Sequence, residues 1–105
     1  MKNMFDIMKQ AQQLQSRMQD LQTELEAAEV EGRAGGGLVA VTMSGKGEVK
    51  KVSIDPSLMK EDEREVLEDL MVAACADAKA KAEAMAAEKM KAVTGGLPIP
   101  PGLGL

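Results

Sequence analysis

Basic side chains are the residues of this sequence best suited to bind a ligand, because lysine and arginine neutralise the phosphates of a polyanion. They gather near the start of the chain and in residues 79–91, at Lys2, Lys9, Arg17, Lys79, Lys81, Lys89 and Lys91. Lys50 and Lys51 are candidates of lower rank. The single aromatic residue, Phe5, argues against readout of single strands or RNA, which uses stacking on aromatic rings.

Catalytic groups are scarce in the sequence. The absence of histidine removes the commonest general base and the usual activator of a nucleophilic cysteine or serine. Cys75 lies among alanines, where a small buried hydrophobic residue is favoured over a reactive thiol. The carboxylates of residues 61–69 are consecutive, which suits the start of a helix and not a calcium loop. We therefore expect no enzymatic activity, cofactor, metal site or small-molecule substrate.

Charge is unevenly distributed along the chain, although the net charge is −4. Residues 1–19 sum to +2 and residues 70–92 to +1, whereas residues 20–31 sum to −5 and residues 56–69 to −4. If two long helices pack antiparallel, their far halves form basic tips on which a polyanion could dock, and their acidic halves lie beside the sheet. The same lysines could instead complement a helix dipole or cover an exposed face without any ligand.

Two long helices are expected to position these side chains. In residues 4–30, apolar residues recur at the 3,4 spacing of heptads, at Met4, Ile7, Ala11, Leu14, Met18, Leu21, Leu25 and Ala28. We call this set the apolar seam. The second helix is expected from about residue 62 to residue 92, and its alanines predict a close helix–helix approach. No stretch approaches the roughly 20 apolar residues of a membrane helix.

Short strands are expected between the helices. Residues 38–44 and 48–54 are separated by Gly-Lys-Gly, which predicts a hairpin, and residues 30–35 could add a third strand. Val49 breaks the alternation of Val52 and Ile54, which predicts a bulge near Lys50 and Lys51. Asp55 and Pro56 predict a capped turn. An uncovered strand face invites a second copy, so the expected dimer interface is Val39, Val41, Met43, Val52 and Ile54.

Four segments resemble one known family. They are MKQAQQLQSRMQDLQTEL, GGLVAVTMSGKGEVKKVSIDPSL, EVLEDLMVAACADAKAKAEAMAAEKM and GGLPIPPG, and the V-x-I-D-P-S-L stretch at 52–58 is the most specific. They are similar to the YbaB/EbfC family of bacterial nucleoid-associated proteins. The resemblance implies an α+β protomer of order α-β-β-β-α and a tweezer-like homodimer with projecting helices. It also implies duplex DNA binding that alters DNA conformation, and a cytoplasmic, nucleoid location without enzymatic activity.

Two functional hypotheses remain open from the sequence. One is a dimeric DNA-bridging or DNA-bending protein with a role in nucleoid organisation and gene regulation. The other is a helical-hairpin adaptor or chaperone, similar in outline to prefoldin subunits, which would bind protein chains through Met4, Phe5, Met8, Met85 and Met90. The same methionines could simply pack the helices together. The expected organisation is one domain at 1–93 and a flexible Gly/Pro-rich tail at 94–105.

Overall fold

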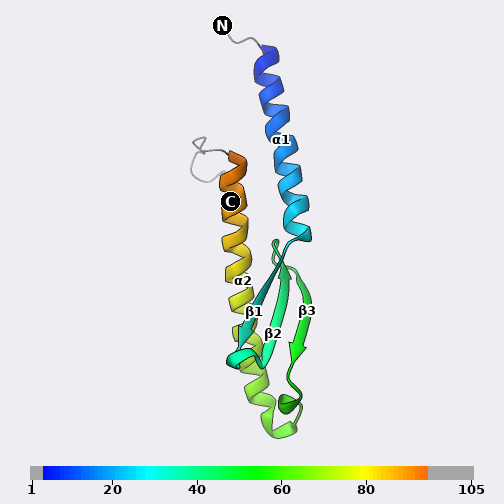
Figure 1. Ribbon diagram of the computed structural model, residues 1–105, viewed down its shortest axis with the longest axis vertical. Coiled ribbons are helices and arrows are strands. Elements are labelled where there is room, and N and C mark those ends of the chain that lie inside the picture. The colour runs from blue at the N-terminus through cyan, green and yellow to red at the C-terminus, as the bar shows by residue number, and fades with distance from the viewer. Residues whose placement is uncertain (1–3, 95–105) are drawn as a thin grey trace.

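The computed structural model, which describes residues 4–94, follows the expected order of helix, three strands and helix (Figure 1). The molecule is elongated and measures 72 × 23 × 16 Å. Its elements are α1 (Met4–Ala27), β1 (Glu29–Ala34), η1 (Gly35–Gly37), β2 (Val39–Ser44), β3 (Val49–Ile54), η2 (Pro56–Leu58), η3 (Glu61–Glu63) and α2 (Arg64–Thr94). The α+β architecture predicted from the sequence is therefore confirmed. Lys2 and the predicted tail after residue 94 lie outside the described residues.

The sheet is antiparallel with β2 in the centre, between β1 and β3. Thr42 lies opposite Lys51 and Met43 lies opposite Val49, so Lys50 has no partner residue on β2. This register shift confirms the predicted bulge. At the other end of β3 the carboxylate of Asp55 accepts a hydrogen bond of 2.9 Å from the backbone N–H of Ser57, which confirms the predicted capped turn.

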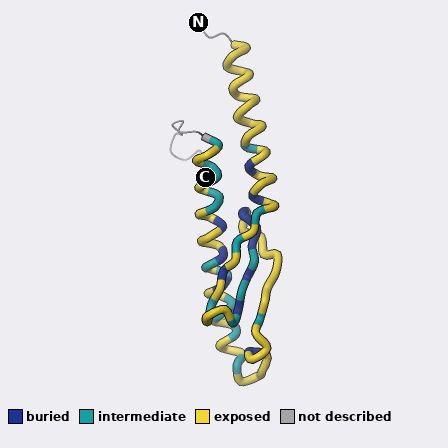
Figure 2. Tube along the Cα trace, in the orientation of Figure 1, coloured by how far each residue is buried: buried dark blue, intermediate teal, exposed yellow. Residues whose placement is uncertain are grey.

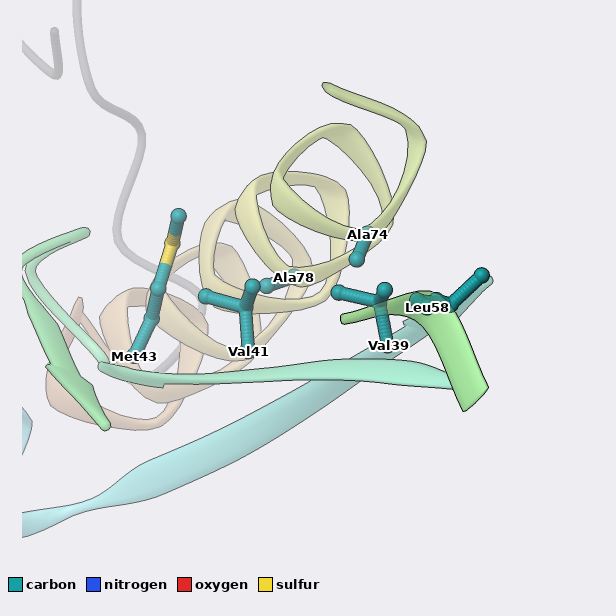
Figure 3. Packing of buried hydrophobic residues seen from close by; sticks show 6 residues of the cluster. All are labelled: Val39, Val41, Met43, Leu58, Ala74 and Ala78. Atoms are coloured by element: carbon teal, nitrogen blue, oxygen red, sulfur yellow. The ribbon is translucent and has the colours of Figure 1, made fainter. Parts of the chain in front are cut away.

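The hydrophobic core lies between α2 and one face of the sheet. Val39, Val41 and Met43 point from β2 toward the helix, where they meet Ala74 and Ala78 (Figure 3). Leu58 of η2 closes one end of this core and is also buried. Because β strands alternate faces, the opposite face of the sheet carries smaller and polar residues and no described helix covers it.

Gly32 of β1 sets how closely α2 approaches the sheet. A Cβ atom on Gly32 would lie 2.3 Å from the backbone oxygen of Ala74 and 2.3 Å from the backbone nitrogen of Ala78. Both alanines are fully buried at this contact. The sequence predicted that these alanines serve a helix–helix contact, whereas in the structure they serve a helix–sheet contact, because α2 runs along the sheet before it reaches α1 (Figure 1).

Helix α1 leaves the sheet as an arm that is attached only near its C-terminal end. The backbone N–H of Gly45 donates to the carbonyls of Leu25 and Ala28 at 2.8 and 3.1 Å. Leu21 and Leu25 are the buried residues of α1, whereas residues 4–17 are all exposed (Figure 2). We call residues 4–17 the distal arm. Neither helix, within the part that the structure describes, is long and apolar enough to cross a membrane.

Candidate nucleic-acid interface

The distal arm presents two of the predicted DNA-binding residues, Lys9 and Arg17, and both are exposed. Within residues 4–94 neither side chain forms an ion pair or hydrogen bond. α2 ends at Thr94, beside the middle of α1, so the distal arm extends past it (Figure 1). Lys9 and Arg17 are therefore available to phosphates and are not held by neighbouring carboxylates.

The last turns of α2 lie against α1 and carry two further predicted residues. Lys89 is half-buried, and its Nζ lies 3.3 Å from Oε2 of Glu24 on α1. Lys91 is exposed in the last turn of α2, where its charge complements the helix dipole. The ion pair of Lys89 crosses between the helices, so it helps to fix α1 against α2 as well as contributing positive charge.

Lys79 and Lys81 lie beside the sheet and not at the end of an arm, which differs from the expectation of basic tips on both helices. Nζ of Lys81 lies 3.1 Å from Oδ2 of Asp77 and donates to the carbonyl of Glu31 on β1 at 2.8 Å. Oδ2 of Asp77 also accepts from the backbone N–H of Arg33 at 3.0 Å. That N–H, and then Lys81, lowers the pKa of Asp77 below its usual value. Lys81 is thus engaged within the protomer.

Lys79 lines a hollow of about 330 Å³ between α1, the β2–β3 turn and α2. Lys46 of the turn lines the same hollow, and its Nζ lies 3.0 Å from Oε1 of Glu26. The sequence reasoning did not select Lys46. The carboxylate partner of Lys46 is twenty residues away in the chain, so the sequence does not show this ion pair. The one local signal for Lys46 is its position between two glycines in a turn.

The adjacent lysines of β3 have different surroundings. Nζ of Lys50 donates to the backbone carbonyl of Glu26 at 2.8 Å, so this bulge residue caps the C-terminal end of α1. Lys51 is exposed on the face of the sheet opposite α2 and has no ion pair within the described chain. Of the two, Lys51 is the one available to a ligand.

A model of the YbaB/EbfC DNA-binding family matches residues 1–97. The chain belongs to the YbaB/EbfC DNA-binding family. The family match agrees with the arrangement described above, in which exposed basic residues project on a helical arm.

Relatives support the same assignment over the full length of the chain. It is 62% identical over 105 residues to a nucleoid-associated protein of Nitrobacter hamburgensis, covering 100% of this chain and 99% of the relative. It is 55% identical over 105 residues to a nucleoid-associated protein of Agrobacterium fabrum, covering 100% of this chain and 98% of that one. A solved structure of an uncharacterized protein of Helicobacter pylori has the same fold, with a TM-score of 0.79 and 19% identity over 90% of this chain and 100% of that one.

The acidic start of α2 lies at the opposite end of this YbaB/EbfC protomer from the distal arm (Figure 1). The sequence predicted that the two acidic segments, residues 20–31 and 56–69, lie where the helices meet the sheet. That is true of the end of α1, but α2 begins beyond the far end of the sheet, because η2 and η3 carry the chain past it. The two ends of the molecule therefore differ in charge, with Glu61, Asp62 and Glu63 at one end and Lys9 and Arg17 at the other.

The residues predicted to form a dimer interface fall into two groups. Val39, Val41 and Met43 are buried under α2 of their own chain, at 0%, 0% and 5% exposure. Val52 is 40% exposed on β3, and Ile54 is half-buried. The first group is the core of the protomer. The physical reason is that α2 packs over β2, which the hydrophobic pattern of the strand alone does not reveal.

No group of three or more metal-ligating side chains lies together within residues 4–94. Cys75 is half-buried on α2 and packs against the core, whereas the sequence predicted a buried residue.

Proposed function

We propose that this chain binds duplex DNA through the distal arms of a homodimer and changes the conformation of the DNA, as a nucleoid-associated protein of the cytoplasm. It would act without catalysis, in nucleoid organisation and gene regulation. The family and the names of its relatives support DNA binding and the nucleoid role. The observation that carries the rest is the distal arm, on which Lys9 and Arg17 are exposed and form no ion pair or hydrogen bond within residues 4–94.

The proposal ranks the basic residues by their surroundings. Lys9 and Arg17 are the principal phosphate contacts, with Lys2 beside them in sequence, and Lys91, Lys89 and Lys79 lie farther back along the molecule. Lys81 and Lys50 are ranked last because each already donates to a backbone carbonyl. A ligand that recruited them would have to replace those hydrogen bonds.

Salt-dependent binding to a labelled duplex tests this ranking. Fluorescence anisotropy at several salt concentrations gives the slope of log K against log salt, which is about −0.9 for each phosphate neutralised in B-DNA. The double variant Lys9→Glu with Arg17→Glu should bind at least about ten-fold more weakly at low salt. Its slope should be shallower by about 0.9 for each phosphate that the variant no longer neutralises.

A matched control uses the other end of the molecule. Lys60 and Arg64 are exposed beside the acidic start of α2. Lys60→Glu with Arg64→Glu changes the net charge by the same amount and should leave affinity within about two-fold, because the screened potential falls off over roughly 10 Å. If both double variants weaken binding equally, net charge and not the arm governs binding.

The change in DNA conformation has its own test. A duplex carrying a fluorophore at each end reports bending through the energy transfer between its ends, and a pull-down of a second, unlabelled duplex reports bridging. A bound complex with unchanged end-to-end distance and no captured second duplex would contradict this part of the proposal.

Homodimerisation is proposed from surfaces that the protomer leaves uncovered. Val49 and Val52 are 53% and 40% exposed on β3, and the N-terminal part of the apolar seam is exposed on the distal arm. A chain of this length buries a modest fraction of its surface alone, so association would add stability. Light scattering should give a dimer mass, and Val52→Glu should lower it toward the monomer. A wild-type monomer at micromolar concentration would exclude this interface.

A second candidate function is favoured by three side chains at the end of the arm. Met4, Phe5 and Met8 are 77%, 80% and 56% exposed, as a surface that grips unfolded chains would require. Suppression of the aggregation of a denatured test protein would support this function, and Phe5→Ala would then weaken it. Met85 and Met90, predicted for the same surface, are half-buried.

A further inference from the structure

The distal arm carries glutamine side chains, which can form hydrogen bonds with DNA bases as well as with phosphates. All six glutamines of the chain lie within α1, at Gln10, Gln12, Gln13, Gln15, Gln19 and Gln22. Four of them fall in the distal arm, where every side chain is exposed. A glutamine amide offers a donor and an acceptor side by side, which is the pattern that pairs with adenine in the major groove.

One stripe of the arm combines an amide with apolar and charged neighbours. Phe5, Lys9, Gln12 and Ser16 are spaced 4, 3 and 4 residues apart, so at about 100° per residue they fall within roughly 60° of arc. We call these four residues the polar stripe. The apolar seam at Ile7 and Leu14 lies on nearly the opposite side of the helix. The seam can therefore pack against protein while the polar stripe stays free.

The polar stripe is sterically and chemically open. Phe5 is 80% exposed, and no hydrogen bond or ion pair within residues 4–94 occupies the side chains of Lys9, Gln12 or Ser16. The fourteen residues of the distal arm span about 21 Å as a helix, beyond the end of α2. That length and a single-helix width suit the major groove of B-DNA, which is about 12 Å wide and 8.5 Å deep.

We propose that the polar stripe enters the major groove and makes this protein prefer sequences with an A·T pair at the position that Gln12 reaches. The inference rests on the proposed function, which supplies the DNA. Gln12 pairs with the adenine edge, Phe5 lies against a thymine methyl group, and Ser16 donates to a neighbouring base or phosphate. Lys9 binds a phosphate at the groove wall, which fixes the helix in register but reads no base.

Selection from a pool of random duplexes, each about two helical turns long, tests the stripe. Wild-type protein is bound to the pool, and the bound fraction is sequenced to give the enrichment of each base pair. The same pool is then bound by Gln12→Ala, Phe5→Ala and Gln10→Ala. Gln10 lies about 130° from the polar stripe on the same exposed helix, so Gln10→Ala is a matched control. Circular dichroism checks that each variant folds.

Gln12→Ala should lose about ten-fold discrimination at one or two A·T positions, with total binding to the pool nearly unchanged. Phe5→Ala should lose discrimination at a neighbouring thymine, and Gln10→Ala should match wild type. DNA binding by wild type without any enrichment, or enrichment that Gln12→Ala leaves intact, overturns the stripe but leaves the proposed function standing. Failure of wild type to bind the pool at all refutes the proposed function itself. If Phe5→Ala or Gln12→Ala changes the mass of the oligomer and leaves the enrichment unchanged, the replaced side chain contacts protein and not DNA. That result also overturns the inference.

Discussion

Replacing Gly32 by alanine tests the contact that places α2 on the sheet. The added Cβ would lie 2.3 Å from the backbone of Ala74 and of Ala78, and 2.7 Å from the Cα atom of Ala78. Ordinary contact begins at 3.4 Å. The neighbours are helix backbone and cannot rotate away as a side chain would. The helix must therefore move off β1 by about 1 Å, or the strand must bend.

The cost of that movement can be estimated from the packing it disturbs. Val39, Val41, Ala74 and Ala78 are all fully buried at this layer. A gap of about 0.5–1 Å forfeits roughly a quarter to a half of the dispersion energy at each contact. Overpacking of a tight core typically costs about 1–3 kcal/mol, and rigid backbone partners favour the upper end of that range. We expect Gly32→Ala to lower the free energy of unfolding by about 3 kcal/mol.

Urea denaturation followed by circular dichroism, at one fixed protein concentration, measures this loss. Gly36→Ala is the matched control, because a Cβ on Gly36 would meet nothing within 4 Å and this position differs from an ordinary one only in its φ of +70°. A positive φ costs alanine about 1 kcal/mol. If Gly32→Ala costs no more than Gly36→Ala, the close approach of helix and strand does not limit stability and the reasoning fails.

Three further predictions concern the contacts that hold α1 and β1 in place. Leu21 is 2% exposed, so Leu21→Ala should lower the free energy of unfolding in urea by about 3 kcal/mol. Leu14 is 44% exposed, so Leu14→Ala should lower it by less than about 1 kcal/mol. Equal losses for the two variants would contradict the burial pattern. Lys50→Met should lower stability by about 0.5–1 kcal/mol, since it removes the ammonium that caps α1; an unchanged denaturation midpoint would exclude that role. The pKa of Asp77 is lowered in the folded state, so the stability that its carboxylate contributes is present above the ordinary carboxyl pKa near 4 and is lost as pH falls below it. The free energy of unfolding should therefore fall more between about pH 6 and pH 3 for wild type than for Asp77→Asn. An identical fall in both proteins would refute this role of Asp77.

Local features of the fold could be predicted from the sequence because neighbouring residues determine them. The heptad spacing predicted α1, the Gly-Lys-Gly stretch predicted the hairpin, and the broken alternation at Val49 predicted the bulge that Lys50 occupies. The predicted ends of the helices differ from the observed ends by two or three residues, since α1 ends at Ala27 and α2 runs from Arg64 to Thr94. Residues 28–30 could extend a helix in isolation, but Glu29 and Val30 pair with β2.

Contacts between distant segments could not be predicted in the same way. Ala74 and Ala78 would allow the close approach of either a second helix or a glycine on a strand. Only the fold shows that they pack against Gly32. Likewise the sequence shows Lys81 as a free cation, whereas Asp77 and the carbonyl of Glu31 engage it. Lys9 and Arg17 are exposed, as charged residues on a helix with few neighbours are expected to be, but their contact with DNA stays a prediction.

Asp77 and Lys81 of α2 form hydrogen bonds with the outer edge of β1, which bears on the association of strands from different molecules. The outer side of β1 presents the N–H of Arg33 and the carbonyl of Glu31, and α2 occupies both of them. Exposed strand edges recruit strands from other molecules and so initiate fibrils. β3, the other edge, carries a bulge at Lys50 and the charge of Lys51, which disfavour such recruitment. Each edge of this small sheet therefore carries a feature that disfavours the addition of a foreign strand, although much of one face stays uncovered.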